Sequence, residues 1–136
     1  MTLMSMPTPI DERDGRTCTI AEASERTGVS AHTLRYYERV GLIDAVPRTS
    51  GGQRSYTPRD LGRIVFLSRM RATGMPVEAL RRYVELIREG SHTSSDRRSL
   101  LEAHRAEVAE RITILTDALT VLDNKIEEYR IWEQEQ

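Results

Sequence analysis

One stretch of the chain spaces several polar groups at the interval of a helix. Residues 33–38 read TLRYYE, with Ser30 before them and Gly41 after them. If they are helical, the 3.6-residue period gathers two guanidiniums, an imidazole and a phenol on one side, while Leu34 points to another. These polar side chains belong to His32, Arg35, Tyr36 and Arg39. The pattern predicts a helix face that binds a partner, and the neighbouring segments must position it.

The preceding segment has the pattern of a short helix and a tight turn. In TIAEASERTG, Thr19 and Glu22 predict a capping box at the start of a helix, and Gly28 predicts its end. Ser30 is the expected N-cap of the next helix, where its hydroxyl would satisfy amides that could otherwise face phosphate. Helix, turn and helix in this order predict a helix-turn-helix, whose second helix enters the major groove of DNA.

A hairpin signal follows. Residues 44–56, DAVPRTSGGQRSY, carry Pro47, Gly51 and Gly52 between short extended pieces. Next to a helix-turn-helix, such a hairpin is the wing of a winged helix. Arg54 would then clamp a DNA phosphate, and the alternative is a solvated turn with an ordinary arginine. The polar side chains on or beside the wing are Arg48, Gln53, Arg54 and Tyr56.

A third helix is expected after the wing. Thr57 and Asp60 predict a second capping box, with Pro58 at the first helical position. Apolar residues then recur at helical spacing, and Gly74 marks the end of the helix.

A fourth helix is expected to start after Pro76 and to close at Gly90. Residues 91–96, SHTSSD, have the composition of a linker. The domain boundaries predicted from these signals are a disordered lead-in at 1–17, a DNA-binding domain at 18–90 and a long helix at 91–136.

From Leu101 the apolar pattern becomes a heptad. Spacings of four and three alternate without a break, which is typical of the seam of a two-stranded coiled coil. A stripe that packs within the monomer is the alternative, but the small domain has little surface to cover it, and a chain with 5% aromatic residues makes a thin core by itself. We therefore expect a homodimer. The seam residues are Val108, Ile112, Leu115, Leu119, Leu122, Ile126 and Tyr129.

The charge is divided unevenly along the chain. The formal net charge is −1, yet residues 30–82 hold ten arginines against four acids, whereas residues 91–136 hold six basic residues against ten acids. A basic half joined to an acidic half is expected when one end of a protein meets phosphate. Nineteen of the twenty basic residues are arginine. This bias suits bidentate contacts with phosphate or guanine, and a GC-rich genome would produce it equally well.

Length and hydropathy restrict the function further. The 136 residues have room for one DNA-binding domain of ~75 residues and one long helix. No run of eighteen apolar residues and no signal peptide is present, so we expect a cytoplasmic protein without a membrane partner. No catalytic constellation or phosphate loop stands out, so we do not expect an enzyme.

These motifs together resemble one known family. Residues 19–75, from TIAEASERTGVS through TLRYYERVGLI, GGQRSY and TPRDLGRI to RMRATGM, resemble the DNA-binding domain of the MerR family of bacterial transcription regulators. The resemblance implies a mainly α fold, with a winged helix-turn-helix followed by a dimerisation helix that pairs antiparallel. It also implies a homodimer that binds an inverted repeat in promoter DNA and distorts the spacer for RNA polymerase.

The predicted DNA contacts divide into two groups. Base edges in the major groove are expected to meet Thr33, Arg35, Tyr36 and Arg39, and the DNA backbone is expected to meet Tyr37, Arg54 and Tyr56. The alternative function is an adaptor or architectural protein whose coiled coil recruits another partner. The full predicted DNA-binding set is Ser30, His32, Thr33, Arg35, Tyr36, Tyr37, Arg39, Arg48, Gln53, Arg54 and Tyr56.

The signal that such a regulator senses has no clear mark in the sequence. Cys18 is the only cysteine, and the histidines are scattered, so we expect neither a metal site nor a cofactor. The tail resembles the small aldehyde or nitrogen-stress branch of the family, but Arg69 stands where that branch carries a reactive cysteine. Tyr129 and Trp132 could line a pocket for an unknown small-molecule inducer or simply cap the coiled coil.

Overall fold

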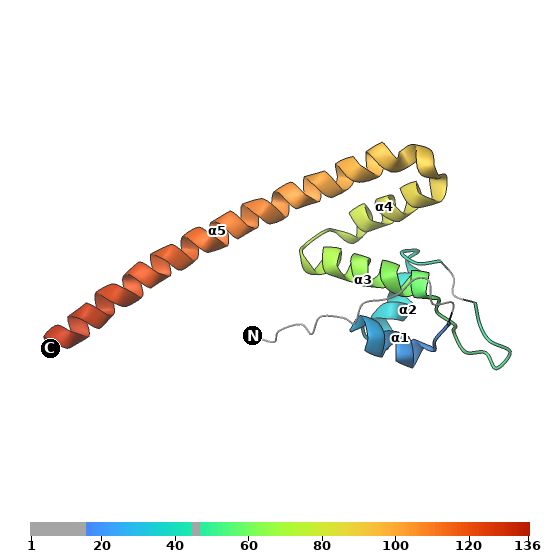
Figure 1. The fold of residues 1–136 in the computed structure, drawn as a ribbon, viewed down its shortest axis with the longest axis horizontal. Helices are drawn as coiled ribbons and strands as arrows, with labels where there is room; N and C mark the ends of the chain where they lie inside the picture. The colour runs from blue at the N-terminus through green and yellow to red at the C-terminus, as the bar shows by residue number, and fades with distance from the viewer. Residues whose placement is uncertain (1–15, 45–46) are drawn as a thin grey trace. The chain divides into compact units, whose positions relative to one another are not determined.

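The computed structural model describes residues 16–44 and 47–136 of the chain. Most of the predicted lead-in therefore lies outside the described residues, as do two positions before the wing. The chain divides into two compact units, one ending at Ser94 and the other running from Ser95 to Gln136. The elements in order are α1 (Ile20–Thr27), α2 (Ala31–Arg39), α3 (Pro58–Ala72), α4 (Val77–Glu89), the 3₁₀ turn η1 (Ser91–Thr93) and α5 (Ser94–Glu135), labelled in Figure 1.

The start of α1 and the turn that follows it are those predicted. The Thr19 hydroxyl accepts a hydrogen bond from the Glu22 amide at 3.2 Å, and the Glu22 carboxylate accepts one from the Thr19 amide at 3.1 Å. Gly28 ends α1 with φ of +74°, a left-handed conformation that favours glycine. The Ser30 hydroxyl then caps α2 by accepting from the Thr33 amide at 3.2 Å. The helix-turn-helix is confirmed.

The capping box of α3 is also confirmed. The Thr57 hydroxyl accepts from the Asp60 amide at 3.1 Å, while the Asp60 carboxylate accepts from the Thr57 amide at 2.9 Å. Pro58 occupies the first helical position, where a missing N–H removes no helical hydrogen bond. These contacts fix the start of the helix that carries much of the core.

The linker predicted at residues 91–96 is wrong. Residues 91–93 form the turn η1, and α5 has already begun at Ser94. The Thr93 hydroxyl holds the turn to the end of α4, because its single proton is shared between the backbone carbonyls of Leu86 and Gly90. Serine and aspartate are common in linkers, but they are equally favoured at the start of a helix, which is where Asp96 lies.

The wing is a hairpin held by isolated bridges between its two arms. Arg48 pairs with Arg54 in an antiparallel bridge, and Thr49 and Gly52 close the turn, with the Gly52 amide donating to the Thr49 carbonyl at 2.9 Å. A second bridge joins Tyr56 to Cys18, just before α1. The hairpin projects from the helices in Figure 1. Its base is therefore tied to the helix-turn-helix through backbone hydrogen bonds.

The core of the N-terminal unit draws on all four of its α-helices. In α2, Leu34 is fully buried and Tyr37 is 4% exposed. Burying a side chain as large as leucine stabilises a fold by about 1.5–3 kcal/mol, so this contact fixes the rotation of α2 about its axis. The largest fully buried side chains are Tyr56, Leu34, Leu42, Ile43, Leu61, Ile64, Leu67, Met75, Leu80 and Val84.

The C-terminal unit is a long helix with apolar side chains in solvent. α5 has 42 residues, and it is continuous in Figure 1. On the predicted seam, Leu115 is 64% exposed and Leu119 is 59% exposed. Exposed apolar side chains off the seam include Ile114, Val121, Ile131 and Trp132. Among the described helices, none has an apolar stretch long enough to span a membrane.

The capping of α3 gives a first test. Replacing Thr57 with alanine removes the hydroxyl that satisfies the Asp60 amide, so we expect Thr57→Ala to lower the free energy of unfolding by about 1 kcal/mol. Urea unfolding at fixed protein concentration measures it. Ser99→Ala, at an exposed position within α5, is the control and should change stability by less than about 0.5 kcal/mol. Equal effects of the two variants would contradict the capping role.

Candidate nucleic-acid interface

The outer face of α2 carries most of the predicted base-contacting side chains. His32, Arg35 and Arg39 are exposed, and Thr33 and Tyr36 are half-buried. Leu34, on the opposite side, lies in the core. One buried face and one polar face are what a helix needs in order to dock in a groove while it stays anchored to its domain.

Two local contacts organise this face. The Arg39 guanidinium lies over the Tyr36 ring, with Cζ at 5.5 Å from the ring centroid, within the range of a cation–π interaction. At the other end of α2, the Ser30 hydroxyl donates to the Thr33 hydroxyl at 2.9 Å and accepts from its amide. Ser30 is therefore engaged within the helix start. Its contribution is to orient Thr33 and the first turn of α2.

Arg54 differs from the free phosphate clamp that was predicted. Its Nε–H donates to the Glu38 carboxylate at 2.7 Å, and the two side chains are only 22% and 19% exposed. The pair ties the returning arm of the wing to α2 and engages the Nε–H group of Arg54. Arg54 positions the wing against α2, and the pair lies sixteen residues apart in sequence, which no local pattern indicates.

Tyr37 and Tyr56, which we expected to meet the DNA backbone, are buried in the core. They are 4% and 0% exposed, and burial raises the pKa of both hydroxyls. The nearby Ser68 side chain and Arg71 guanidinium oppose the rise of the pKa at Tyr37. The Tyr56 hydroxyl has no hydrogen-bond partner among the residues that the structure describes. In the sequence, the tyrosine hydroxyls indicated contacts with DNA. In the fold, the apolar rings place both side chains in the core.

The wing adds polar side chains next to the start of α1. Arg48 and Gln53 are exposed, and Arg48 Nη1 donates to the Gly52 carbonyl at 3.0 Å, which stiffens the turn. Together with the first residues of α1 they line a hollow of about 300 Å³. The wing and the first residues of α1 thus share one concave surface.

Arg88, which no sequence pattern pointed to, fixes the loop after α2. From the end of α4, its Nη2 donates to the Gly41 carbonyl at 3.1 Å and to the Asp44 carboxylate at 2.9 Å. These residues are more than forty positions apart. The contact holds the C-terminal end of the helix-turn-helix against α4.

Cys18 is poorly suited to redox sensing. It is 7% exposed, and burial raises the pKa of its thiol, against the opposing effect of the nearby Arg26 guanidinium. The reactive form of cysteine is the thiolate, so a raised pKa keeps Cys18 unreactive near neutral pH. Within residues 16–44 and 47–136, no cluster of three or more His, Cys, Asp and Glu side chains is placed to hold a metal ion.

Two protein-family models match the chain, one over the N-terminal unit and one that extends into α5. A family model described as the MerR HTH family regulatory protein matches residues 18–87, and one described as MerR, DNA binding matches residues 61–125. The HTH-type transcriptional regulator AdhR of Bacillus subtilis is 42% identical over 91 residues, which are 67% of this chain and 65% of that protein. The chain thus spans just under two thirds of that relative's length.

Two solved structures are similar over most of their length. A putative MerR family transcriptional regulator from Listeria monocytogenes is 46% identical, with a TM-score of 0.77, over 82% of this chain and 85% of that chain. The regulator HiNmlR, described as lacking the sensor domain and bound to promoter DNA, is 35% identical, with a TM-score of 0.79, over 84% and 86%. The chain belongs to the MerR family of DNA-binding transcription regulators, a family that is not enzymatic.

Proposed function

We propose that the chain works as a homodimer that binds an inverted repeat in a promoter. The observation that carries this proposal is the outer face of α2, which presents Arg35, Arg39 and Tyr36 to solvent while Leu34 anchors the helix in the core. Arginine makes bidentate contacts with guanine in the major groove, and such contacts carry sequence information. Promoter DNA is in the cytoplasm of a bacterium, so this is where the protein would act.

The side chains take different roles in this proposal. Thr33, Arg35, Tyr36 and Arg39 meet base edges or nearby phosphates, with His32 at the margin, and Arg48 and Gln53 meet the backbone from the wing. Ser30, Tyr37, Arg54 and Tyr56 act through structure, since the Ser30 hydroxyl and the Arg54 Nε–H group have partners within the fold and both tyrosines are buried. Phosphate contacts would fix the register of the protein on the duplex, and base contacts would choose the site.

α5 would join the two protomers. Its seam residues are about half exposed or more from Ile112 to Tyr129, and burying them against a second copy removes this apolar surface from water. The family resemblance favours antiparallel pairing, which places the two DNA-binding domains (the heads of the dimer) on two half-sites. An inverted repeat mirrors the two-fold symmetry of such a dimer.

The mechanism that fits this arrangement is distortion of the promoter spacer. By family resemblance, the dimer bends and untwists DNA between two promoter elements so that RNA polymerase engages both. Bending a site of this size costs about 1–6 kcal/mol, which contacts from both heads and both wings would offset. The structure of HiNmlR bound to promoter DNA supports the DNA-binding half of this proposal.

A second candidate function is an architectural protein whose α5 recruits a different chain. Ile114 and Val121 favour it, because they are 58% and 66% exposed and lie outside the seam. A two-stranded coiled coil buries mainly its seam, so these side chains would remain in water. Transcription from the promoter by purified RNA polymerase distinguishes the two candidates. If adding the dimer alone changes the amount of transcript, the protein acts as the regulator that distorts the spacer.

Replacing Arg35 tests whether the outer face of α2 contacts DNA bases. Arg35→Ala should weaken binding to the specific duplex by about 1–3 kcal/mol if the guanidinium contacts a guanine, with little change on a scrambled duplex. Gel shifts at fixed salt measure both affinities. An equal loss on both duplexes assigns Arg35 to phosphate. Arg105→Ala, exposed on α5, is the charge-matched control, and unchanged binding by Arg35→Ala would remove this residue from the interface.

Adjacent tyrosines offer a matched pair of hydroxyl deletions. Tyr37→Phe removes a hydroxyl that lies in the core next to the Ser68 side chain and should lower the free energy of unfolding by about 0.5–1.5 kcal/mol. DNA affinity should stay unchanged where the protein is folded. Tyr36→Phe should do the reverse, with several-fold weaker DNA binding and unchanged stability. Urea unfolding and gel shifts give the four values, and exchanged outcomes would return Tyr37 to the DNA surface.

The dimer seam can be tested with neighbouring substitutions. Leu119→Asp places a charge within the seam and should convert the dimer to monomer, because an unpaired carboxylate would be buried. Thr120→Asp, next along the helix but outside the seam, should leave the dimer intact. Sedimentation equilibrium reports the molecular mass of each variant. A dimer that survives Leu119→Asp would show that another surface joins the protomers.

A further inference from the structure

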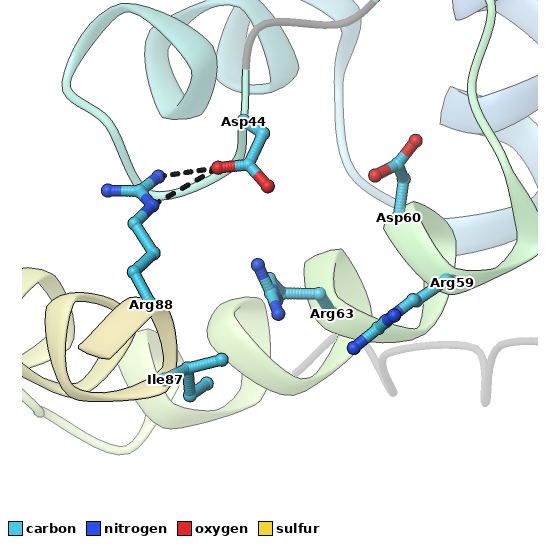
Figure 2. A pocket seen from close by; sticks show the side chains of 6 residues that line it. All are labelled: Asp44, Arg59, Asp60, Arg63, Ile87 and Arg88. Atoms are coloured by element: carbon cyan, nitrogen blue, oxygen red, sulfur yellow. Dashed lines mark hydrogen bonds and ion pairs between the residues drawn. The ribbon is translucent and has the colours of Figure 1, made fainter. Parts of the chain in front are cut away.

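A pocket of about 260 Å³ lies between the first turns of α3, the end of α4 and the loop after α2. Figure 2 shows Arg59, Asp60 and Arg63 coming from α3, Ile87 and Arg88 from α4, and Asp44 from the loop. All of these lining residues belong to the N-terminal unit. None of them is among the side chains of α2 or of the wing that we assign to DNA.

The two acidic side chains of the pocket already have partners. Both Nε and Nη2 of Arg88 donate to the Asp44 carboxylate, at 3.1 and 2.9 Å, as Figure 2 shows. The Asp60 carboxylate accepts from the Thr57 amide in the capping box. Neither carboxylate forms an ion pair with the two remaining guanidiniums.

Arg59 and Arg63 therefore have no ion-pair partner in the pocket. Among the described residues, neither side chain makes a hydrogen bond or an ion pair. Figure 2 shows the Arg63 guanidinium directed from α3 into the space between Arg88 and Asp60. With three guanidiniums and two carboxylates, the pocket carries one net positive charge.

The placement of these two arginines is unfavourable without a ligand. They are four residues apart on α3, where like charges repel each other across one helical turn. They also lie in its first two turns, and the dipole of a helix disfavours cations at its N-terminal end. An anion between the two guanidiniums would offset both their mutual repulsion and the unfavourable helix dipole. It would also accept hydrogen bonds from their N–H groups.

We propose that this pocket binds a phosphate group through Arg59 and Arg63. Guanidiniums match the tetrahedral oxygens of phosphate with paired hydrogen bonds. Ile87 provides an apolar wall, and the volume is small for a binding site, so it suits a phosphate with a small substituent. The phosphate belongs either to a free phosphate compound or to the DNA backbone. Only the second source rests on the proposed DNA binding.

Thermal unfolding tests whether the pocket binds phosphate. The probe is inorganic phosphate, titrated against sodium chloride of matched ionic strength. The wild-type chain should show a saturable rise in Tm, because a ligand that binds only the folded state stabilises it. Arg59→Gln/Arg63→Gln should lose this rise, and each single variant should lose part of it. Arg98→Gln/Arg105→Gln removes the same charge from α5 and should keep it.

The salt dependence of DNA affinity identifies the source. If the group is a DNA phosphate, the double pocket variant should lower the slope of log K against log salt by about one or two per head, relative to wild type and the α5 control. If it is a free compound, the slope should not change and only the Tm response should be lost.

Two results would overturn the proposal. One is a phosphate response that persists in the double pocket variant, since phosphate then binds elsewhere. The other is that phosphate raises the Tm of no chain, wild type included, while the slope of log K against log salt is the same for all chains. A wild-type chain that binds no DNA would refute the proposed function alone, because the Tm experiment contains no DNA and still reports on the pocket.

Discussion

The burial of Leu34 and Tyr37 on one side of α2 is the contact on which the DNA-facing surface depends. A helix of nine residues is too short to be stable by itself in water, so its orientation comes from packing. With these two side chains in the core, the 3.6-residue period leaves Arg35 and Arg39 outside. Rotation of α2 by one residue would bury a guanidinium and expose leucine, and both changes are unfavourable. The functional face is thus a consequence of the apolar one.

Arginine serves this fold in two distinct ways. Arg54 and Arg88 are structural: the first joins the wing to α2 through Glu38, and the second joins α4 to the loop after α2 through Asp44. The Arg54 pair is about one fifth exposed, so water weakens it less than the Arg88 pair, which is about half exposed. Arg35 and Arg39 face solvent and remain available to a polyanion. An excess of arginine in the sequence therefore overstates the number of DNA contacts.

The parts of the fold that could be predicted from sequence are those set by neighbours along the chain. The capping boxes at Thr19 and Thr57 join residues three apart, and the heptads of α5 repeat every seven residues. The family resemblance extended these local signals to a fold. What could not be predicted arises from packing between distant segments: the Arg88–Asp44 pair, the burial of Tyr56 and the pinning of η1 by Thr93. A tyrosine has both an apolar ring and a hydroxyl, and only the surrounding structure decides which one matters.

The contrast between the two units links assembly to DNA binding. The N-terminal unit buries a set of large side chains, whereas α5 keeps ten large apolar residues about half exposed or more. A helix of this kind gains most of its stability from a partner, so its apparent stability depends on protein concentration. In the proposed dimer, binding of the second half-site becomes intramolecular once the first is occupied, and the effective concentration then depends on how rigidly α5 separates the heads. The apolar seam would thereby set both the oligomeric state and the gain in affinity for a two-fold symmetric DNA site.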